Sequence, residues 1–114
     1  METEKYVRTP ISLEQLFKLD TDMLDEHDLY AKKDIVKFDI NTLVYLDDLI
    51  DVDDDTDDEI YPSFALDLNL QWLFSGQVIS DIIVNTQHQL TNPTVNDYIK
   101  NFIYYHKHDC FITF

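Results

Sequence analysis

The sequence has a single cysteine and a single glycine among its 114 residues, and each scarcity excludes a class of function. Cys110 has no partner for an internal disulfide, which fits a reducing compartment, so we expect a cytoplasmic protein. Cys110 also lacks the positive neighbours that stabilise a thiolate, and we expect it to be a small buried residue. Gly76 alone does not make the glycine-rich loop that cradles a phosphate.

The sequence also lacks a long apolar run. Its first residues, Met1-Glu2-Thr3-Glu4-Lys5, are acidic where a secretory signal needs positive charge, and no stretch behind them suits a signal core or a membrane span. We therefore expect a soluble protein with no membrane contact. Residues 1–114 have the length of a single domain, and a hydrophobic content of 45% is enough for one core.

Positive charge is the third scarcity. Eight Lys and Arg stand against 23 Asp and Glu, which gives a net charge of −15. No Lys or Arg occurs between Lys37 and Lys100, whereas thirteen acidic residues do. Phosphate backbones and anionic membrane surfaces repel such a body, so we expect no nucleic-acid or lipid partner and instead a partner with a basic surface.

Nine of the acidic residues fall in residues 47–59. Mutual repulsion disfavours a packed element there, and the pattern predicts an exposed acidic loop that is mobile unless something cationic sits on it. We expect its acidic residues to form the partner-binding surface: Asp47, Asp48, Asp51, Asp53, Asp54, Asp55, Asp57, Asp58 and Glu59.

Alternating acids within this loop have the spacing of calcium ligands. Asp51, Asp53, Asp55 and Asp57 alternate as the first ligands of an EF-hand do, because a hard cation needs carboxylates that converge from one tight turn. The match then fails, since Thr56 stands where the turn needs glycine and Pro62 stands where a bidentate Glu is needed. We expect no metal site in the loop.

The histidines and the cysteine suggest no site either. His106, His108 and Cys110 are zinc-binding residue types, but residues two apart on a helix point in different directions. We interpret the two histidines as helix-end residues that interact with the dipole. His27 and His88 have no base, nucleophile or acid nearby in the sequence. We therefore expect no catalytic residues, no cofactor and no enzyme activity.

Periodicity predicts an α+β domain, with a small antiparallel sheet packed with an N-terminal helix and two C-terminal helices. Ser12 and Gln15 have the form of a capping box at the start of the first helix. Asn92-Pro93-Thr94 supplies a cap and a first-turn proline for the last one. The expected elements are helices over 12–20, 64–68, 77–90 and 95–108, strands over 36–40, 43–46 and 71–74, and a docked apolar tail over 111–114.

Several segments resemble a family of small acidic bacterial proteins. They are Pro62-Ser63-Phe64-Ala65, residues 70–75, residues 78–83 with Asn85, and residues 102–112 with the run Tyr104-Tyr105-His106. The similarity covers half to two-thirds of the chain, and it lies in core and turn residues. The resemblance implies an α+β domain of the kind that occurs as immunity proteins beside secreted toxins, including those of contact-dependent growth inhibition. It carries no functional residues over to this chain, and the Asp-rich segment is longer here than in that pattern.

Charge and resemblance together lead to the functional hypothesis. We expect an immunity protein that neutralises a cognate toxin domain, a basic nuclease above all, by blocking its active site or substrate groove. An acidic loop complements such a groove and accelerates association. Two alternatives remain open at this stage: an acidic nucleic-acid mimic of the anti-restriction or anti-CRISPR type, and a non-catalytic acidic adaptor domain.

Overall fold

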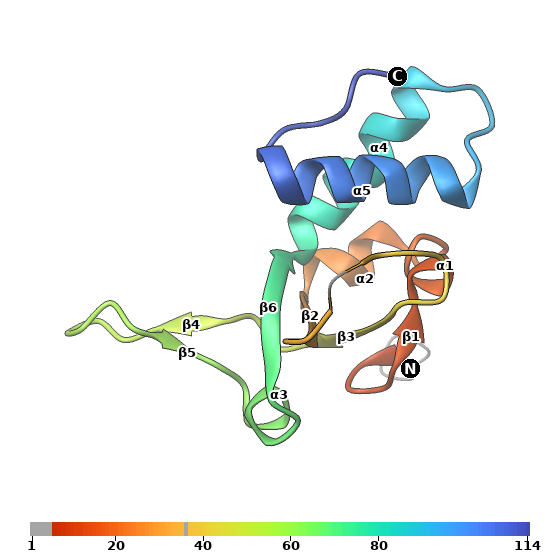
Figure 1. Ribbon diagram of the computed structural model, residues 1–114. Helices are drawn as coiled ribbons and strands as arrows, with labels where there is room; N and C mark the ends of the chain where they lie inside the picture. The colour runs from red at the N-terminus through yellow and green to blue at the C-terminus, as the bar shows by residue number, and fades with distance from the viewer. Residues whose placement is uncertain (1–5, 36) are drawn as a thin grey trace.

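A computed structural model describes residues 6–35 and 37–114 and arranges them as short helices around a small sheet (Figure 1). The elements, in chain order, are β1 (Ile11–Ser12), α1 (Leu13–Leu16), α2 (Thr21–Asp25), β2 (Asp28–Lys32), β3 (Leu43–Asp47), β4 (Asp51–Val52), β5 (Glu59–Ile60), α3 (Ser63–Asp67), β6 (Leu70–Ser75), α4 (Gly76–Gln89) and α5 (Val95–His108). The predicted α+β class is confirmed.

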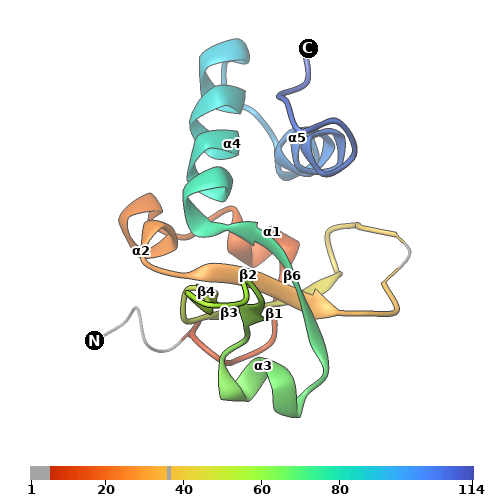
Figure 2. The ribbon, with the colours of Figure 1, turned by 90° about the vertical axis from the view of Figure 1, so that its left-hand side faces the viewer.

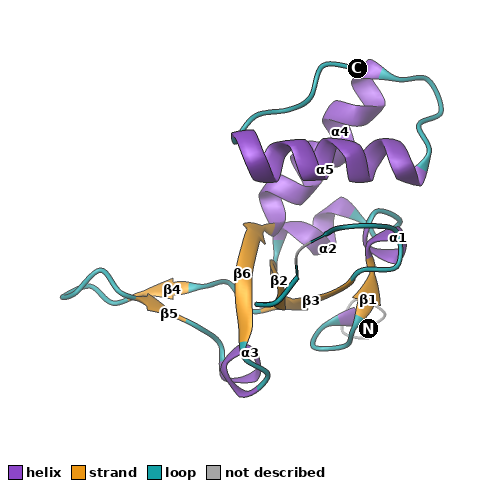
Figure 3. Cartoon of the chain, in the orientation of Figure 1, coloured by secondary structure: helices purple, strands orange, loops and turns teal. Residues whose placement is uncertain are grey.

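Four strands form an antiparallel sheet in the order β1-β3-β2-β6, and β4 and β5 form a separate two-stranded hairpin (Figure 3). In the central pair, Leu29 lies opposite Leu46 and Tyr30 lies opposite Tyr45. Because successive side chains of a strand point to opposite faces, the two pairs belong to different layers. The leucine pair belongs to the main core with α1, α2, α4 and α5, and the tyrosine pair to a smaller core with α3. Figure 2 shows α4 and α5 on one side of the sheet and α3 on the other.

The first helix begins as predicted and ends earlier. Ser12 and Gln15 form the expected capping box, but α1 stops at Leu16. The Asp20 side chain then accepts a hydrogen bond from the backbone N–H of Asp22 at 2.9 Å and caps the new helix α2. The prediction of one helix over 12–20 is therefore wrong: α1 ends four residues before Asp20, and the Asp20 cap begins a second helix.

The predicted strand over 36–40 is also wrong where it can be compared. Val36 lies outside the described residues, and residues 37–40 form no strand. The strand at this point of the fold is β2 instead, at Asp28–Lys32. Its first four residues, Asp28 to Ala31, are buried on both faces of the sheet, so the sequence there does not show the polar–apolar alternation of a half-exposed strand.

The C-terminal half follows the predictions closely. α3, β6, α4 and α5 lie where periodicity places them, although Pro93 precedes the capping residue Thr94 rather than occupying the first turn. The tail docks on α4 and α5 without forming a strand. The buried Asn101 accepts a hydrogen bond from the backbone N–H of Ile112 at 3.0 Å and donates to Thr86 at 3.0 Å, which joins the two helices and the tail.

Within the described residues, no helix combines the length and the apolar character needed to cross a membrane.

Candidate functional site: an acidic arm and its buried root

The most prominent feature outside the body of the protein is the β4–β5 hairpin, which projects away from the sheet (Figure 1). We call residues 49–60 the acidic arm. Its turn is ordered by hydrogen bonds: the Asp53 N–H donates to Asp58 O at 2.8 Å, and the Asp57 N–H donates to Asp53 O at 2.9 Å. The Asp53 carboxylate accepts from the backbone N–H groups of Asp55 at 2.8 Å and Thr56 at 3.1 Å. These backbone donors lower the pKa of Asp53. The segment predicted as a mobile loop is a hairpin.

The root of the arm is fixed by side chains from the sheet. The Asp28 carboxylate is buried and its Oδ2 accepts from the Ile50 N–H at 2.9 Å and from Trp72 Nε1 at 2.9 Å. The Tyr30 hydroxyl donates to the backbone carbonyl of Asp48 at 2.8 Å. Asp28 and Tyr30 of β2 therefore fix the backbone at Ile50 and Asp48, where the arm begins, and Trp72 of β6 holds the Asp28 carboxylate in place.

Asp47 corrects the predicted site. It was expected on the exposed partner-binding surface, but it lies at the end of β3 with its side chain buried. Its Oδ1 accepts from the Asp48 N–H at 2.7 Å and lies 3.4 Å from Arg8 Nε, whereas its Oδ2 is buried without a hydrogen-bond partner among the described residues. Arg8 also reaches the exposed Asp48 at 3.5 Å. Asp47 is therefore a structural residue of the root.

The other predicted residues gather as expected on the surface. They are Asp48 at the root and Asp51, Asp53, Asp54, Asp55, Asp57, Asp58 and Glu59 on the arm; all are exposed except Asp53, which is partly buried. The ion pairs among the described residues are those of Arg8 with Asp47 and Asp48. No described Lys or Arg therefore neutralises a carboxylate of the arm itself.

Sequence analysis missed the apolar residues of the arm. Leu49, Val52 and Ile60 are 56%, 46% and 47% exposed. The register pairs Asp51 with Ile60 and Val52 with Glu59. Since directly opposed side chains share a face of the hairpin, each face carries one apolar and one acidic side chain. The sequence does contain a signal for these residues, because apolar side chains are interspersed among the acids of the segment. The interpretation from charge alone overlooked them.

The buried root gives a prediction for alkaline pH. Burial, with the carboxylates of Asp28 and Asp47 nearby, raises the pKa of Tyr30 well above its ordinary value. The unfolded chain loses this proton near pH 10 and the folded chain keeps it, so above about pH 10 the free energy of unfolding falls by up to about 1.4 kcal/mol per pH unit. Urea unfolding of wild type and Tyr30→Phe should show the stability advantage of wild type shrinking between about pH 10 and pH 11. An advantage that stays constant would contradict it.

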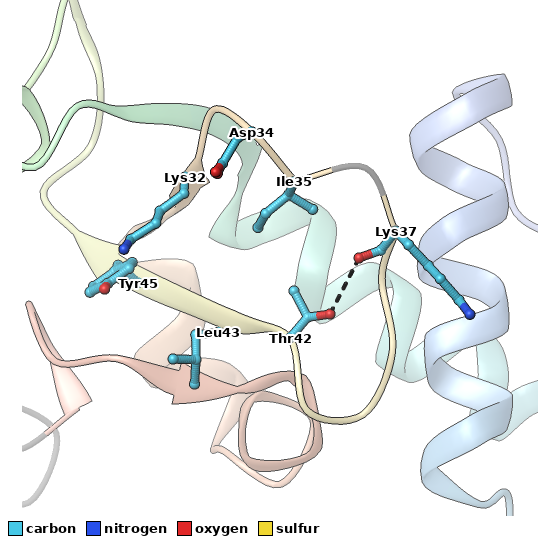
Figure 4. Close-up of a pocket in the computed structure, with 7 residues that line it drawn as sticks. All are labelled: Lys32, Asp34, Ile35, Lys37, Thr42, Leu43 and Tyr45. Carbon is cyan, nitrogen blue, oxygen red and sulfur yellow. Dashed lines mark hydrogen bonds between the residues drawn. The ribbon is translucent and has the colours of Figure 1, made fainter.

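A second region stands out by the opposite charge. Lys32 ends β2, Lys33 and Lys37 follow it in the β2–β3 loop, and all three line cavities. One cavity, of about 370 Å³, lies between the β2–β3 loop and β3 and includes Lys32, Leu43 and Tyr45 (Figure 4). Figure 4 shows the Lys37 side chain pointing away from this cavity, toward α5. There a neighbouring cavity of about 450 Å³ is lined by Lys37 together with Lys107 of α5.

The histidines near the end of α5 pack against aromatic rings, and His106 also lines the cavity of about 450 Å³. His106 packs with its ring against Phe38 and Phe74, at centroid distances of 5.4 and 5.7 Å, and His108 packs against Tyr104 at 4.3 Å. In the described part of the chain, no three His, Cys, Asp or Glu side chains gather as metal ligands. Cys110 is exposed, so the prediction that it is buried is wrong. It lies directly after Asp109, whose backbone is in the left-handed conformation and ends α5, so Cys110 is not on the buried face of that helix.

Comparison with known proteins gives one match. A family described as "Domain of unknown function (DUF7716)" matches residues 10–114. No curated protein and no solved structure matches the chain.

Proposed function

The chain belongs to the DUF7716 family of domains of unknown function, and we propose that it is a non-catalytic binding protein whose acidic arm docks onto a basic protein partner. In its sharper form the proposal is that of an immunity protein: the partner is a toxin domain with a positively charged substrate groove, such as a nuclease, and the arm blocks that groove. The observation that carries the proposal is the arm itself, a projecting hairpin with unneutralised carboxylates and exposed apolar side chains.

Charge and apolar surface have separate roles in such a contact. The carboxylates between Asp51 and Glu59 attract a basic surface over a distance and raise the association rate by about 10- to 1,000-fold at low salt. Val52 and Ile60 offer apolar surface that water leaves when the partner docks. An arm that served solubility alone would not need exposed valine and isoleucine among its acids.

The anchored root supports the proposal further. Asp28 and Tyr30 bind the backbone at Ile50 and Asp48, and Asp53 orders the turn. Because the arm already has a defined conformation before binding, less conformational entropy is lost when a partner immobilises it.

The distribution of the carboxylates favours a protein partner over nucleic-acid mimicry. A mimic of duplex DNA needs negative charges at duplex-like spacing over a broad face. Here seven carboxylates lie in the nine residues from Asp51 to Glu59, on one narrow hairpin. A narrow arm of this kind can insert into the groove of a protein partner. A nucleic-acid mimic instead needs a wide acidic face that occupies the whole surface on which the duplex would lie.

Neutralising the arm should slow association while the fold stays intact. The variant carries Asp54→Asn, Asp55→Asn, Asp57→Asn and Asp58→Asn and keeps Asp53, whose carboxylate orders the turn. We expect the association rate to fall by about tenfold or more at low salt, with a flatter salt dependence, because steering charges are lost. The measurement is surface plasmon resonance at two salt concentrations against the cognate toxin domain, which the proposal expects to be encoded by a neighbouring gene.

The matched control neutralises four exposed acids outside the arm: Asp22, Glu26, Asp67 and Asp81. It changes the net charge by the same amount, so a general charge effect would slow both variants equally. We expect the control to stay within about twofold of wild type, since local rather than net charge steers docking. Equal kinetics for the two variants would place the interface elsewhere.

A further inference from the structure

The cavity between the β2–β3 loop and α5 gathers positive charge in a strongly acidic protein. Lys33 and Lys37 line it from the loop, and His106 and Lys107 line it from the last turn of α5. We call this cavity the cationic cleft. Its described lining contains three of the eight Lys and Arg residues of the chain and no carboxylate. Asp34 lines the adjoining cavity instead.

The three lysines of the cleft form no ion pair with a described carboxylate. Among the described residues, ion pairs are made by Arg8 alone, on Asp47 and Asp48, so no described carboxylate lies within ion-pair distance of Lys33, Lys37 or Lys107. Like charges around one cavity repel one another, and a bound anion removes that repulsion. A multivalent anion matches several lysines better than a single carboxylate does, and lysine binds phosphate as a point charge.

Apart from Gln71, the rest of the cleft is apolar. Ile35, Phe38 and Ile103 line it and are each only partly buried, so apolar surface is left for a ligand. The Phe38 ring is held in place by edge contacts with Phe102 at 5.2 Å and with His106 at 5.4 Å. A volume of about 450 Å³ lies within the range of small-molecule sites, which are mostly apolar with a few polar groups that orient the ligand.

We propose that the cationic cleft binds a small aromatic phosphate. Its ring packs on the apolar wall formed by Ile35, Phe38 and Ile103, and its dianionic group lies among the three ammonium groups. A long polyanion does not fit this assignment, because the cleft is a single cavity and the chain as a whole carries a net charge of −15, which repels a polyanion. The site is independent of the acidic arm and of the partner proposed for it.

The test is an NMR titration of the isotope-labelled protein with 1-naphthyl phosphate, compared with its two halves, 1-naphthol and inorganic phosphate. We expect shifts of backbone amides confined to residues 32–38, 71 and 103–108, and tighter binding of 1-naphthyl phosphate than of either half. The variant with Lys37→Gln and Lys107→Gln should bind at least about tenfold more weakly, because two charge-assisted contacts are lost. A control with Lys18→Gln and Lys100→Gln, two exposed lysines outside the cleft, should bind as wild type does.

Four results would overturn the proposal. Two concern the shifts: 1-naphthyl phosphate causes no shifts, or it causes shifts centred outside the cleft. Two concern affinity: 1-naphthol or inorganic phosphate binds as tightly as 1-naphthyl phosphate, or the cleft variant and the control variant weaken its binding equally. A short single-stranded oligonucleotide that binds more tightly than 1-naphthyl phosphate would overturn the assignment of a small ligand.

Discussion

Replacement of Phe102 by alanine is expected to lower the free energy of unfolding by about 3 to 5 kcal/mol, because it removes a completely buried ring. Phe102 lies on α5 and contacts Phe17 at 5.9 Å, Phe38 at 5.2 Å and Phe74 at 5.2 Å. These rings come from α1's C-cap, the β2–β3 loop and β6, so no single neighbour can move in to fill the cavity. Urea unfolding followed by circular dichroism measures the loss.

The control for this variant is Lys100→Ala on the same helix. Lys100 is exposed, and alanine favours helix at least as well as lysine, so its effect should stay within about 0.5 kcal/mol. A similar loss of stability in both variants would show that the helix, rather than the packing of Phe102, determines the result.

Replacement of Gly76 by alanine should destabilise the protein by about 3 kcal/mol or more. A Cβ at this position would overlap the backbone carbonyl oxygens of Leu24 and His27, at the end of α2. The Leu24 carbonyl cannot retreat freely, because it accepts the backbone N–H of His27 at 3.1 Å. Inserting atoms into packed structure costs about 1 to 3 kcal/mol when side chains yield, and here the obstacle is backbone.

Gln77→Ala is the matched control at the next position of α4. Gln77 is exposed, and only its hydrogen bond to Asp81 at 3.2 Å is lost. Circular dichroism with urea should show Gln77→Ala close to wild type, while Gly76→Ala unfolds at much lower urea or fails to fold. A Gly76→Ala protein as stable as wild type would mean that α2 and α4 lie further apart than the structure places them.

Sequence periodicity was reliable where local signals and tertiary packing agree. Thr94, within the predicted cap segment, caps α5; α4 lies within one residue of its predicted range; and the apolar stripe around Ile99 and Phe102 is buried as the 3.6-residue pattern predicts. Periodicity was unreliable for a strand whose side chains are buried on both faces of the sheet. β2 has no alternation to detect, because Leu29 and Tyr30 are both completely buried, in different cores.

The sequence by itself determined the α+β class, the acidic segment and its charge, since composition and periodicity are properties of neighbouring residues. Only the tertiary structure decided that Asp47 is buried beside Arg8 and that Asp28, 22 residues from Ile50, anchors the arm. Only it brought Lys37 and Lys107 to one cavity. Such contacts join residues far apart along the chain, and they depend on strand register and helix packing, which no local pattern specifies.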